Sequence, residues 1–376
     1  MKIAIDALPA KSLHHGMGTY IYNLLKNLIS FNSGHEFIIY KKPEVFTDLE
    51  KDQNQQVQFR NIKKSRNQRV LWEYTTLPKL LQKEQVDIFW GPSNFLPLRK
   101  ACKYVVTIHD LSSFTYADTY PYLRRKYYQY IIKQAVKRAD LIVTDSEFSR
   151  QDIVNTFSIP AEEVKVISCG IDDIFQPIDC SDKHTQIKSK YKLPDDFIFT
   201  LGVIEPKKNT QRLVQAYTQL KNKHVDLPKL VVGGSKKYGW KNRRIFQLVD
   251  ELKLKDSVIF TGFIEHQDLP VIYSTAKLFI LPSLFEGFGL PVIEAMACGT
   301  PVITSNTSSL PEIAGDAAVL INPYDTEEIG QAIIKVISDQ QLQTEMRAKG
   351  FKNVKRFSWQ ESAHELLDVF EQIGKK

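Results

Sequence analysis

The sequence predicts an α/β protein of two doubly wound domains with parallel sheets. Short strand-like runs alternate with longer helical patterns along the whole chain, which is typical of βαβ units. At 376 residues the chain is too long for one ordinary hydrophobic core. With 43% hydrophobic and 25% charged residues, it can bury sizeable cores and does not resemble a disordered chain.

The expected strands are short runs rich in β-branched and aromatic residues. In the first half they are residues 2–6, 35–41, 57–62, 86–91, 104–110, 140–146 and 164–170. In the second half they are residues 197–203, 229–234, 257–263, 278–283, 301–306 and 318–323. Apolar residues at helical spacing indicate intervening helices, for example over residues 18–29 and 210–220. Ligand-binding loops of such sheets follow the carboxyl ends of strands, so we expect two domains facing a central cleft.

A polar stretch flanked by prolines separates the two halves. The predicted domains are residues 1–175 and 197–357, with residues 176–196 as the linker. Residues 358–376 carry apolar side chains at helical spacing and are expected to form a closing helix.

Composition excludes several classes of protein. The net charge of +7 favours anionic partners, but no recognisable nucleic-acid-binding module accompanies it, so nucleic acid is not an expected partner. The four cysteines lack CxxC spacing, which argues against a zinc site and a disulfide framework. No apolar run approaches the roughly 20 residues that cross a bilayer. The amino terminus lacks a secretory-signal pattern, so a cytoplasmic location is expected.

The segment EGFGLPVIE, residues 286–294, combines two acids with a glycine-rich turn. A helix is predicted over residues 291–297, so Gly287 and Gly289 directly precede its amino terminus. Free amides and the helix dipole attract anions there, and a phosphate fits the position. Glu286 lies on the turn and Glu294 lies one turn into the predicted helix, so they suit different hydroxyl groups of a sugar nucleotide. The alternative is an ordinary turn with a solvated Glu286.

A basic loop follows the first strand of the second half. Gly202 is followed by Lys207 and Lys208, which can neutralise a diphosphate leaving group. The sequence has no DxD acid pair to hold a metal for that task, so we expect phosphate stabilisation without a metal or other cofactor. The alternative is two solvated loop lysines.

The region around Glu286 resembles the donor-binding signature of glycosyltransferase family 4, a family of retaining enzymes with the GT-B fold. The signature is a glutamate, seven residues, a second glutamate, a GTPV strand and a SLPEIAGDAA segment. The resemblance covers nearly the whole chain. It implies a donor site mainly in the second domain, an acceptor site mainly in the first, and a closing helix that packs back on the first domain.

The resemblance also implies individual roles. Glu286 would contact hydroxyls of the donor hexose near the reacting carbon, and Glu294 would hold the ribose. Lys208 matches the family's phosphate-binding lysine, whereas Val203 replaces its usual arginine, so Lys207 is the expected substitute. Backbone groups would bind hexose and phosphate along the turn and pair with the nucleobase after the strand 257–263; these residues are Gly287, Phe288, Gly289, Leu290, Phe263 and Ile264.

Two loops of the first domain complete the expected site. Gly16 and Gly18 precede a predicted helix and allow close backbone approach to a ligand, and the resemblance implies that they lie near the donor phosphate. His109 ends an apolar strand, and the resemblance places its carbonyl or imidazole beside the transferred sugar, where it would stabilise developing positive charge. For a lone histidine, a satisfied structural residue is the alternative.

A basic segment with interspersed tyrosines, residues 122–140, predicts a helix that contacts anionic lipid headgroups. The alternative is a solvated basic face. Such contact would suit a lipid-linked acceptor and a peripheral location at the inner face of the plasma membrane.

The expected activity is metal-independent, retaining transfer of a hexose from UDP-glucose, GDP-mannose or a similar donor to a sugar or lipid-linked saccharide hydroxyl. The subgroup with the EPKKN form resembles mannosyl- and glucosyltransferases of surface-polysaccharide synthesis. Two alternatives are a sugar-nucleotide epimerase or phosphorylase of the same fold, and a non-catalytic nucleotide-sugar-binding module.

Overall fold

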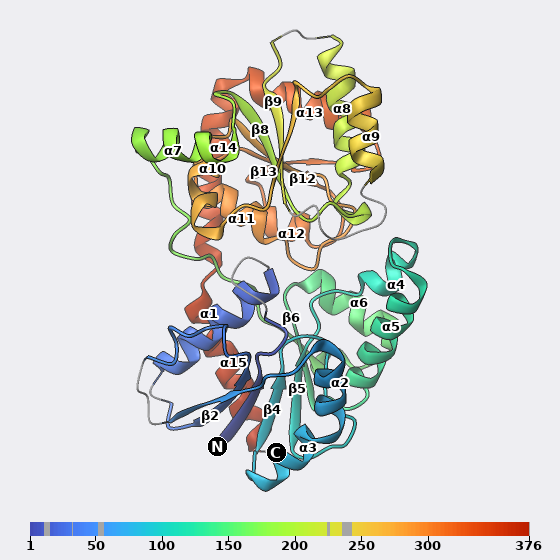
Figure 1. Cartoon of the computed structure of the whole chain (residues 1–376), viewed down its shortest axis with the longest axis vertical. Helices are drawn as coiled ribbons and strands as arrows, with labels where there is room; N and C mark the ends of the chain where they lie inside the picture. Colours follow the sequence, from blue (N-terminus) through green and yellow to red (C-terminus); the bar gives the residue numbers. More distant parts are fainter. Residues whose placement is uncertain (11–15, 32, 52–55, 224–225, 235–242, 376) are drawn as a thin grey trace. The chain divides into compact units, whose positions relative to one another are not determined.

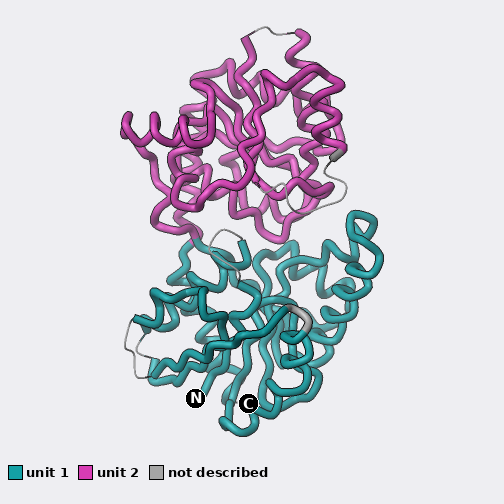
Figure 2. Tube along the Cα trace, in the orientation of Figure 1, with its two compact units in different colours: residues 1–170, 358–376 teal, residues 171–357 magenta. Residues whose placement is uncertain are grey.

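The computed structural model of the chain describes residues 1–10, 16–31, 33–51, 56–223, 226–234 and 243–375. The chain forms two compact units (Figure 2): residues 1–170 with 358–376 are unit 1, and residues 171–357 are unit 2. Unit 2 is therefore one continuous segment inserted into the sequence of unit 1. Its two ends are adjacent, because the Ile171 amide donates a hydrogen bond to the Phe357 carbonyl at 3.2 Å.

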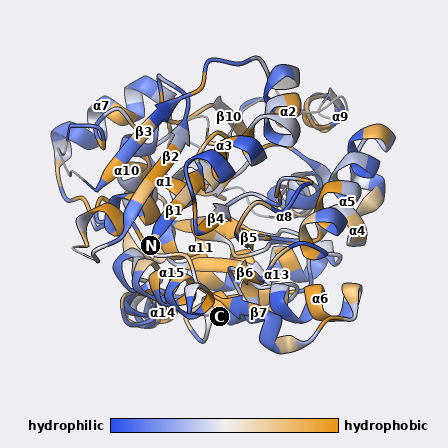
Figure 3. Ribbon diagram, turned by 90° about the horizontal axis from the view of Figure 1, so that it is seen from below, coloured by the Kyte–Doolittle hydropathy of each residue, from blue (hydrophilic) through white to orange (hydrophobic). Residues whose placement is uncertain are grey.

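Unit 1 is built on a parallel sheet in the order β3-β2-β1-β4-β5-β6-β7 (Figure 1). The order reverses between β1 and β4, the position at which doubly wound sheets hold ligands at the carboxyl ends of their strands. The central strands β4, β5 and β6 contain hydrophobic residues (Figure 3) and are buried apart from the first residue of β5, as expected for strands covered on both faces. The strands are β1 (Lys2–Asp6), β2 (Glu36–Lys41), β3 (Val57–Asn61), β4 (Ile88–Gly91), β5 (Lys103–Thr107), β6 (Leu141–Thr144) and β7 (Val164–Val166).

The helices of unit 1 cover both faces of this sheet. The last helix of the chain, α15 (Trp359–Gly374), packs on α1 (Gly16–Ser30), and the Ser362 hydroxyl donates a hydrogen bond to the Ser168 carbonyl at 2.6 Å. Short 3₁₀ turns lie at Ala117–Thr119 and Ala161–Glu163. The other helices are α2 (Arg66–Thr75), α3 (Leu77–Lys83), α4 (Ser112–Thr115), α5 (Tyr122–Val136) and α6 (Glu147–Phe157).

Unit 2 has a second parallel sheet, in the order β10-β9-β8-β11-β12-β13. Here the order reverses between β8 and β11. The strands are β8 (Phe197–Leu201), β9 (Lys229–Gly233), β10 (Val258–Gly262), β11 (Leu278–Leu281), β12 (Val302–Ser305) and β13 (Ala318–Ile321).

Alternate strand residues of unit 2 form two hydrophobic clusters, one on each face of the sheet, because successive side chains of a strand point to opposite faces. Phe199 and Phe279 pack on one face with residues of α10 and α11. Ile198 and Ile280 pack on the other face with residues of α8 and α13. The helices are α7 (Ser181–Tyr191), α8 (Thr210–Lys221), α9 (Arg243–Glu251), α10 (Leu269–Thr275), α11 (Leu290–Ala297), α12 (Leu310–Ala314), α13 (Thr326–Ser338) and α14 (Gln340–Asn353), with 3₁₀ turns at Pro206–Lys208, His266–Asp268 and Val354–Arg356.

The predicted fold class is confirmed: each strand segment expected from the sequence contains a strand, and both sheets are parallel with helices between their strands. The segment 176–196 differs from the expected linker. It belongs to unit 2 and contains α7, whose Ile187 and Tyr191 are buried in the unit 2 core. Its polar composition reflects the exposed faces of α7, and the helix is also held by hydrogen bonds from Lys190 and Tyr191 to Asp268.

No helix among the described residues is long and apolar enough to cross a membrane.

Candidate active site

Three loops converge at the carboxyl ends of the neighbouring strands β8, β11 and β12 in unit 2. The first carries Lys208, the second Ser283 and Glu286, and the third Ser308 and Ser309. Because the strands are parallel and adjacent, their following loops meet at one edge of the sheet, beside the point where the strand order reverses.

Glu286 is the centre of this cluster. Its side chain is only 9% exposed, and its Oε1 atom accepts hydrogen bonds from Lys208 Nζ and Ser283 Oγ, both at 2.6 Å. Its backbone is fixed as well, because the amide donates to Ser308 Oγ at 3.1 Å and the carbonyl accepts from Ser309 Oγ at 3.0 Å. Among the described residues, the second carboxylate oxygen has no hydrogen-bond partner. One oxygen therefore orients the carboxylate, and the other can accept a ligand hydroxyl.

Glycines shape the surfaces next to these groups. A Cβ atom on Gly202 would lie 3.3 Å from the Lys208 side chain, so the glycine gives this side chain room to cross the strand end. Gly289 has a φ of 108°, which favours glycine, and a Cβ there would lie 2.8 Å from the Leu310 side chain. This residue is the N-cap of α11, so the turn delivers the helix amino terminus to the same edge of the sheet.

The predicted residues between the two acids contribute chiefly backbone. The Phe288 side chain is buried against Phe357, with ring centroids 5.5 Å apart, and its carbonyl accepts a hydrogen bond from Ser309 Oγ at 2.9 Å. Leu290 begins α11, and Gly287 lies between Glu286 and Phe288 on the turn. Hydrogen bonds from Ser309 thus fix the carbonyl groups of the turn, and the amides of the turn are the groups that a phosphate would contact.

Glu294 lies in the buried part of α11. Its Oε2 atom accepts a hydrogen bond from the Tyr273 hydroxyl at 2.9 Å. Burial raises the pKa of Glu294, while the nearby His266 and the hydrogen bond from Tyr273 act in the opposite direction. Among the described residues, Oε1 has no hydrogen-bond partner, so this acid too has one fixed and one unused oxygen.

The remaining predicted residues of unit 2 lie around this cluster. Lys207 Nζ is 3.8 Å from a Glu205 carboxylate oxygen, and the Lys207 carbonyl accepts a hydrogen bond from the Leu284 amide at 2.7 Å. Phe263 and Ile264 follow β10, two strands from β8; Phe263 is exposed, whereas the Ile264 side chain belongs to the core. Ile264 can therefore contact a nucleobase through its backbone but not through its side chain.

In unit 1, His109 follows β5 and is held entirely by the protein. Its Nδ1 atom lies 2.6 Å from Asp145 Oδ2, and its Nε2 atom lies 2.9 Å from the Pro92 carbonyl oxygen. A carbonyl and a carboxylate both accept hydrogen bonds, so both ring nitrogens donate. Burial lowers the pKa of His109, but Asp145 and the carbonyl outweigh it and the pKa is raised. Both contacts of the ring favour its protonated form.

This geometry narrows the expected role of His109. Both ring nitrogens already face acceptor groups of the protein, so of the two groups that the resemblance implies, the carbonyl is the better placed to contact a sugar. The His109 carbonyl accepts a hydrogen bond from Ser149 Oγ at 3.1 Å, and a carbonyl oxygen has two lone pairs.

Gly16 and Gly18 lie in the first turn of α1, whereas the sequence predicted a loop before a helix at residue 18. Residues 11–15 lie outside the described residues.

A buried charged cluster also lies at the end of β1. Arg69 on α2 contacts Asp6 Oδ2 at 3.5 Å and forms a close ion pair with Glu73. Burial, together with the neighbouring Asp6 charge, raises the pKa of Glu73 to about 8. Two carboxyl groups share one guanidinium there, so one of them is protonated near neutral pH.

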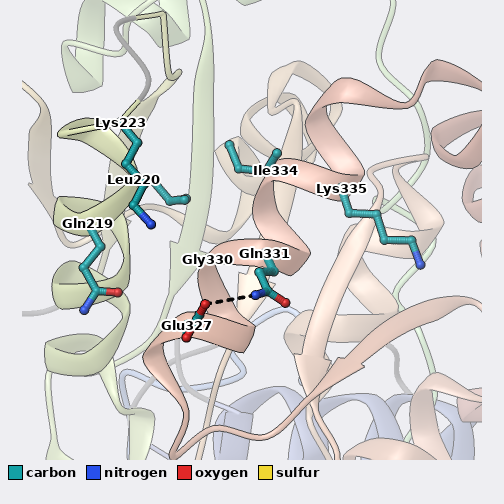
Figure 4. A pocket seen from close by; sticks show the side chains of 8 residues that line it. All are labelled: Gln219, Leu220, Lys223, Glu327, Gly330, Gln331, Ile334 and Lys335. Carbon is teal, nitrogen blue, oxygen red and sulfur yellow. Dashed lines mark hydrogen bonds between the residues drawn. The ribbon is translucent and has the colours of Figure 1, made fainter.

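A groove between α8 and α13 of unit 2 is shown in Figure 4. It is lined by Gln219, Leu220, Lys223, Glu327, Gly330, Gln331, Ile334 and Lys335. Helix α8 runs antiparallel to the strands, so its last turn lies by their amino ends, away from the cluster around Glu286. The groove is therefore separate from the candidate active site.

Among the described residues, no three His, Cys, Asp or Glu side chains are grouped as they would be around a metal.

No individual role was expected from the sequence for four side chains of the site: Ser283, Ser308, Ser309 and Tyr273. Serines are common at strand ends and turns, and Tyr273 lies 21 residues before its partner Glu294 on a different helix. For the serines, the sequence signals were the expected strand ends at residues 283 and 306 and the SLPEIAGDAA segment, which begins at Ser309; Tyr273 had no such signal.

The chain is similar to known glycosyltransferases in both halves. Residues 14–174 match the family described as Glycosyltransferase Family 4, and residues 182–353 match the family described as Glycosyl transferases group 1. The chain is 30% identical to O-antigen chain mannosyltransferase B of Escherichia coli, over 99% of this chain and 100% of that protein. It is 34% identical to the E. coli serotype-specific mannosyltransferase WbdA over 75% of this chain, which spans 34% of that longer protein.

Solved structures share the fold at low sequence identity. Sucrose-phosphate synthase from Thermosynechococcus elongatus superposes with a TM-score of 0.80 at 21% identity, covering 99% of both chains. Anabaena HepE in complex with UDP-glucose gives a TM-score of 0.76 at 16% identity, covering 99% of this chain and 100% of that one.

Proposed function

The chain belongs to glycosyltransferase family 4, and from this premise we propose that it transfers mannose from GDP-mannose to a saccharide hydroxyl in surface-polysaccharide synthesis. Mannose is proposed because the relative that matches over its whole length is an O-antigen chain mannosyltransferase. UDP-glucose is the second candidate donor. The observation that carries the proposal is the Glu286 carboxylate, which Lys208 and Ser283 hold with one oxygen unused.

The donor would bind along the edge of the unit 2 sheet. Glu286 would accept hydrogen bonds from hexose hydroxyls, and Glu294 from the ribose. The diphosphate would lie against the amides before α11, with Lys207 and Lys208 as counter-charges. An ammonium group has three donor hydrogens, so Lys208 can keep its bond to Glu286 while it contacts a phosphate oxygen. Hexose and phosphate would thus be bound by one connected set of charges.

In the proposed reaction the bond between the anomeric carbon and the diphosphate oxygen breaks. The acceptor oxygen forms the new bond on the same face, and its proton passes to the departing phosphate. The products are the glycoside, with retained configuration, and a nucleoside diphosphate. Preorganised cations next to the leaving group stabilise the charge that develops there. The lysines supply this stabilisation, and we propose that the reaction needs no metal. For unit 1 we propose that the His109 carbonyl contacts the transferred sugar.

The test is a panel of GDP- and UDP-sugars, measured first for thermal stabilisation and then for transfer and slow hydrolysis. The proposal predicts that GDP-mannose gives the largest stabilisation, releases GDP and passes mannose to a mannose-containing acceptor. Activity that persists in a chelator supports metal independence. Interconversion of sugar nucleotides without an acceptor would instead indicate an epimerase, and binding without turnover would indicate a non-catalytic module.

We further propose that unit 1 contacts an anionic membrane surface, which would bring the enzyme to a lipid-linked acceptor at the inner face of the plasma membrane. Helices α2 and α5 pack on the same hydrophobic core of unit 1, which includes Trp72 of α2 and Ile131 and Ile132 of α5. Their outer surface combines exposed apolar and aromatic side chains with exposed basic ones: Leu71, Tyr122, Leu123, Tyr127, Tyr130, Arg124, Lys126, Lys133 and Lys137.

Such a surface suits lipid headgroups, because apolar side chains enter the interface while basic ones meet anionic lipids at about 1 kcal/mol each. Sedimentation with phosphatidylglycerol vesicles tests it. Leu123→Asp, on an 81% exposed side chain, and Lys126→Glu should weaken binding, whereas Lys255→Glu in unit 2 should not. Equal sedimentation of all four proteins, or equal binding to phosphatidylcholine, would contradict the membrane proposal.

A further inference from the structure

We propose that Tyr273 is a positioning residue for nucleotide recognition: its hydroxyl fixes the Glu294 carboxylate so that the unused oxygen meets the ribose. This inference rests on the proposed function, in which Glu294 binds the ribose of the donor.

The contact is direct and buried. The Tyr273 hydroxyl donates to Glu294 Oε2 at 2.9 Å, and the Tyr273 side chain is fully buried. Burial and the Glu294 charge raise the pKa of Tyr273 well above its ordinary value, so the phenol keeps its proton and remains a donor. Among the described residues, no other hydrogen bond is made to the Glu294 carboxylate.

The Tyr273 ring is itself held rigidly. It packs edge-on against Phe199, Phe279 and Phe175, with ring centroids 5.5, 5.3 and 6.1 Å away. Its backbone carbonyl accepts a hydrogen bond from Thr300 Oγ1 at 2.6 Å, which ties α10 to the loop before β12. The hydroxyl is therefore fixed by the core of unit 2, and it transmits that rigidity to Glu294.

If Tyr273 and Glu294 had only a structural role, a buried hydrogen bond to a carboxylate would not be needed. A buried carboxylate with one neutral donor costs free energy that two apolar side chains of similar size would not. The arrangement repeats what is found at Glu286, where the Ser283 hydroxyl and Lys208 bind one oxygen and leave the other unused. Binding residues held by their neighbours in one orientation bind ligands with less loss of conformational entropy.

The test compares Tyr273→Phe with a matched control, Tyr217→Phe. Tyr217 is also fully buried in unit 2, and its hydroxyl donates to the Pro228 carbonyl at 3.0 Å, on a helix that does not carry the acids. Calorimetry measures the dissociation constants of GDP and UDP and of their 2′-deoxy and 3′-deoxy analogues. Thermal unfolding of each variant shows that it is folded.

Tyr273→Phe should weaken binding of the preferred nucleotide about 10-fold, the value of one hydrogen bond to a charged group. The wild type should bind the deoxy analogue that lacks the hydroxyl bound by Glu294 more weakly than it binds the full nucleotide. In Tyr273→Phe the contact between Glu294 and this hydroxyl is already impaired, so removing the hydroxyl should weaken binding little further. Tyr217→Phe should behave as the wild type does in both respects.

The pH profile is a second readout. The groups that face Glu294 are His266, Asp172, Tyr273 and the Cys298 thiol. The Tyr273 hydrogen bond lowers the pKa of Glu294, so its loss should move the acid-side decline of nucleotide affinity to higher pH. The control variant should leave the profile unchanged.

Unchanged affinity in a folded Tyr273→Phe, or an equal loss for the nucleotide and both deoxy analogues, would overturn the positioning role alone. A wild type that binds neither GDP nor UDP would overturn the proposed function and this inference together.

Discussion

The two units present their polar groups in opposite ways. In unit 2, Glu286 and Glu294 each use one carboxylate oxygen for a neighbouring side chain and leave the other unused among the described residues. In unit 1, both nitrogens of His109 are bound by the protein itself, to Asp145 and the Pro92 carbonyl. The difference supports the proposal that side chains recognise the donor in unit 2, whereas His109 and Asp145 hold the loop of unit 1 in place.

The comparison predicts that replacing His109 lowers the free energy of unfolding more than replacing Glu286 does. His109→Ala should lower the free energy of unfolding of unit 1 by about 3–5 kcal/mol, because it leaves the buried Asp145 carboxylate without its cationic partner. Chemical denaturation measures the change. Glu286→Gln should change the free energy of unfolding little. Equal stability losses in the two variants would break the comparison.

The reverse ordering is expected for activity. Lys208→Ala and Glu286→Ala should each reduce kcat by 10²–10³-fold, or about 3–4 kcal/mol, because a preorganised group at the reacting centre is lost. The matched control is Lys277→Ala, which removes a half-exposed lysine paired with Asp196 at 3.1 Å in the same unit and should leave turnover unchanged. Near-normal turnover in either active-site variant would remove the role proposed for that residue.

Ser283→Ala sharpens the comparison within unit 2. Removing the hydroxyl should raise the KM for the donor about 10-fold, corresponding to about 1.4 kcal/mol, since Glu286 keeps Lys208 but loses one of its two orienting donors. Steady-state kinetics with the preferred nucleotide sugar measures the effect. Ser338→Ala, at an exposed hydroxyl bonded within α13, is the control. If Ser283→Ala changed stability and left KM unaltered, Ser283 would be a structural residue.

The smallest expected effect is the pH dependence of unit 1 stability. Glu73 has a pKa of about 8 in the folded protein against 4.5 for the free side chain, so the folded state holds its proton across this window. The raised pKa of Glu73 therefore contributes to the stability of the folded state below pH 4.5, and this contribution is lost as the pH rises toward 8. The raised pKa of His109 acts in the same direction, from its ordinary value of 6.5 upward.

We therefore expect the free energy of unfolding of unit 1 to fall by at least about 1 kcal/mol between pH 6 and pH 9. Glu73→Gln should reduce this slope, because an amide does not titrate. Denaturation series at several pH values measure it, and a slope of the opposite sign would show that neither group controls it.

The fold was predictable because its information is local. The strands are short apolar runs with regular spacing, so their positions follow from the sequence, and the glycine turn of 286–294 marked the edge of the unit 2 sheet. The helix in the segment 176–196 was missed because only two of its side chains, Ile187 and Tyr191, enter the core.

The details of the site were less predictable, because they depend on pairs distant in the sequence. Lys208 and Glu286 are 78 residues apart, and His109 and Asp145 are 36 apart, so no local pattern shows which atoms meet. The sequence could place each residue at a strand end. It could not show that the His109 ring is already occupied or that Tyr273 holds Glu294.

The insertion of unit 2 into unit 1 has a consequence for the order of folding during synthesis. Domains generally fold as units while the chain emerges from the ribosome. Unit 2 is complete once residue 357 has emerged, whereas unit 1 still lacks α15, the helix that packs on α1. The segment encoded second can therefore reach its native state first, and the unit that begins the chain is the last to be finished.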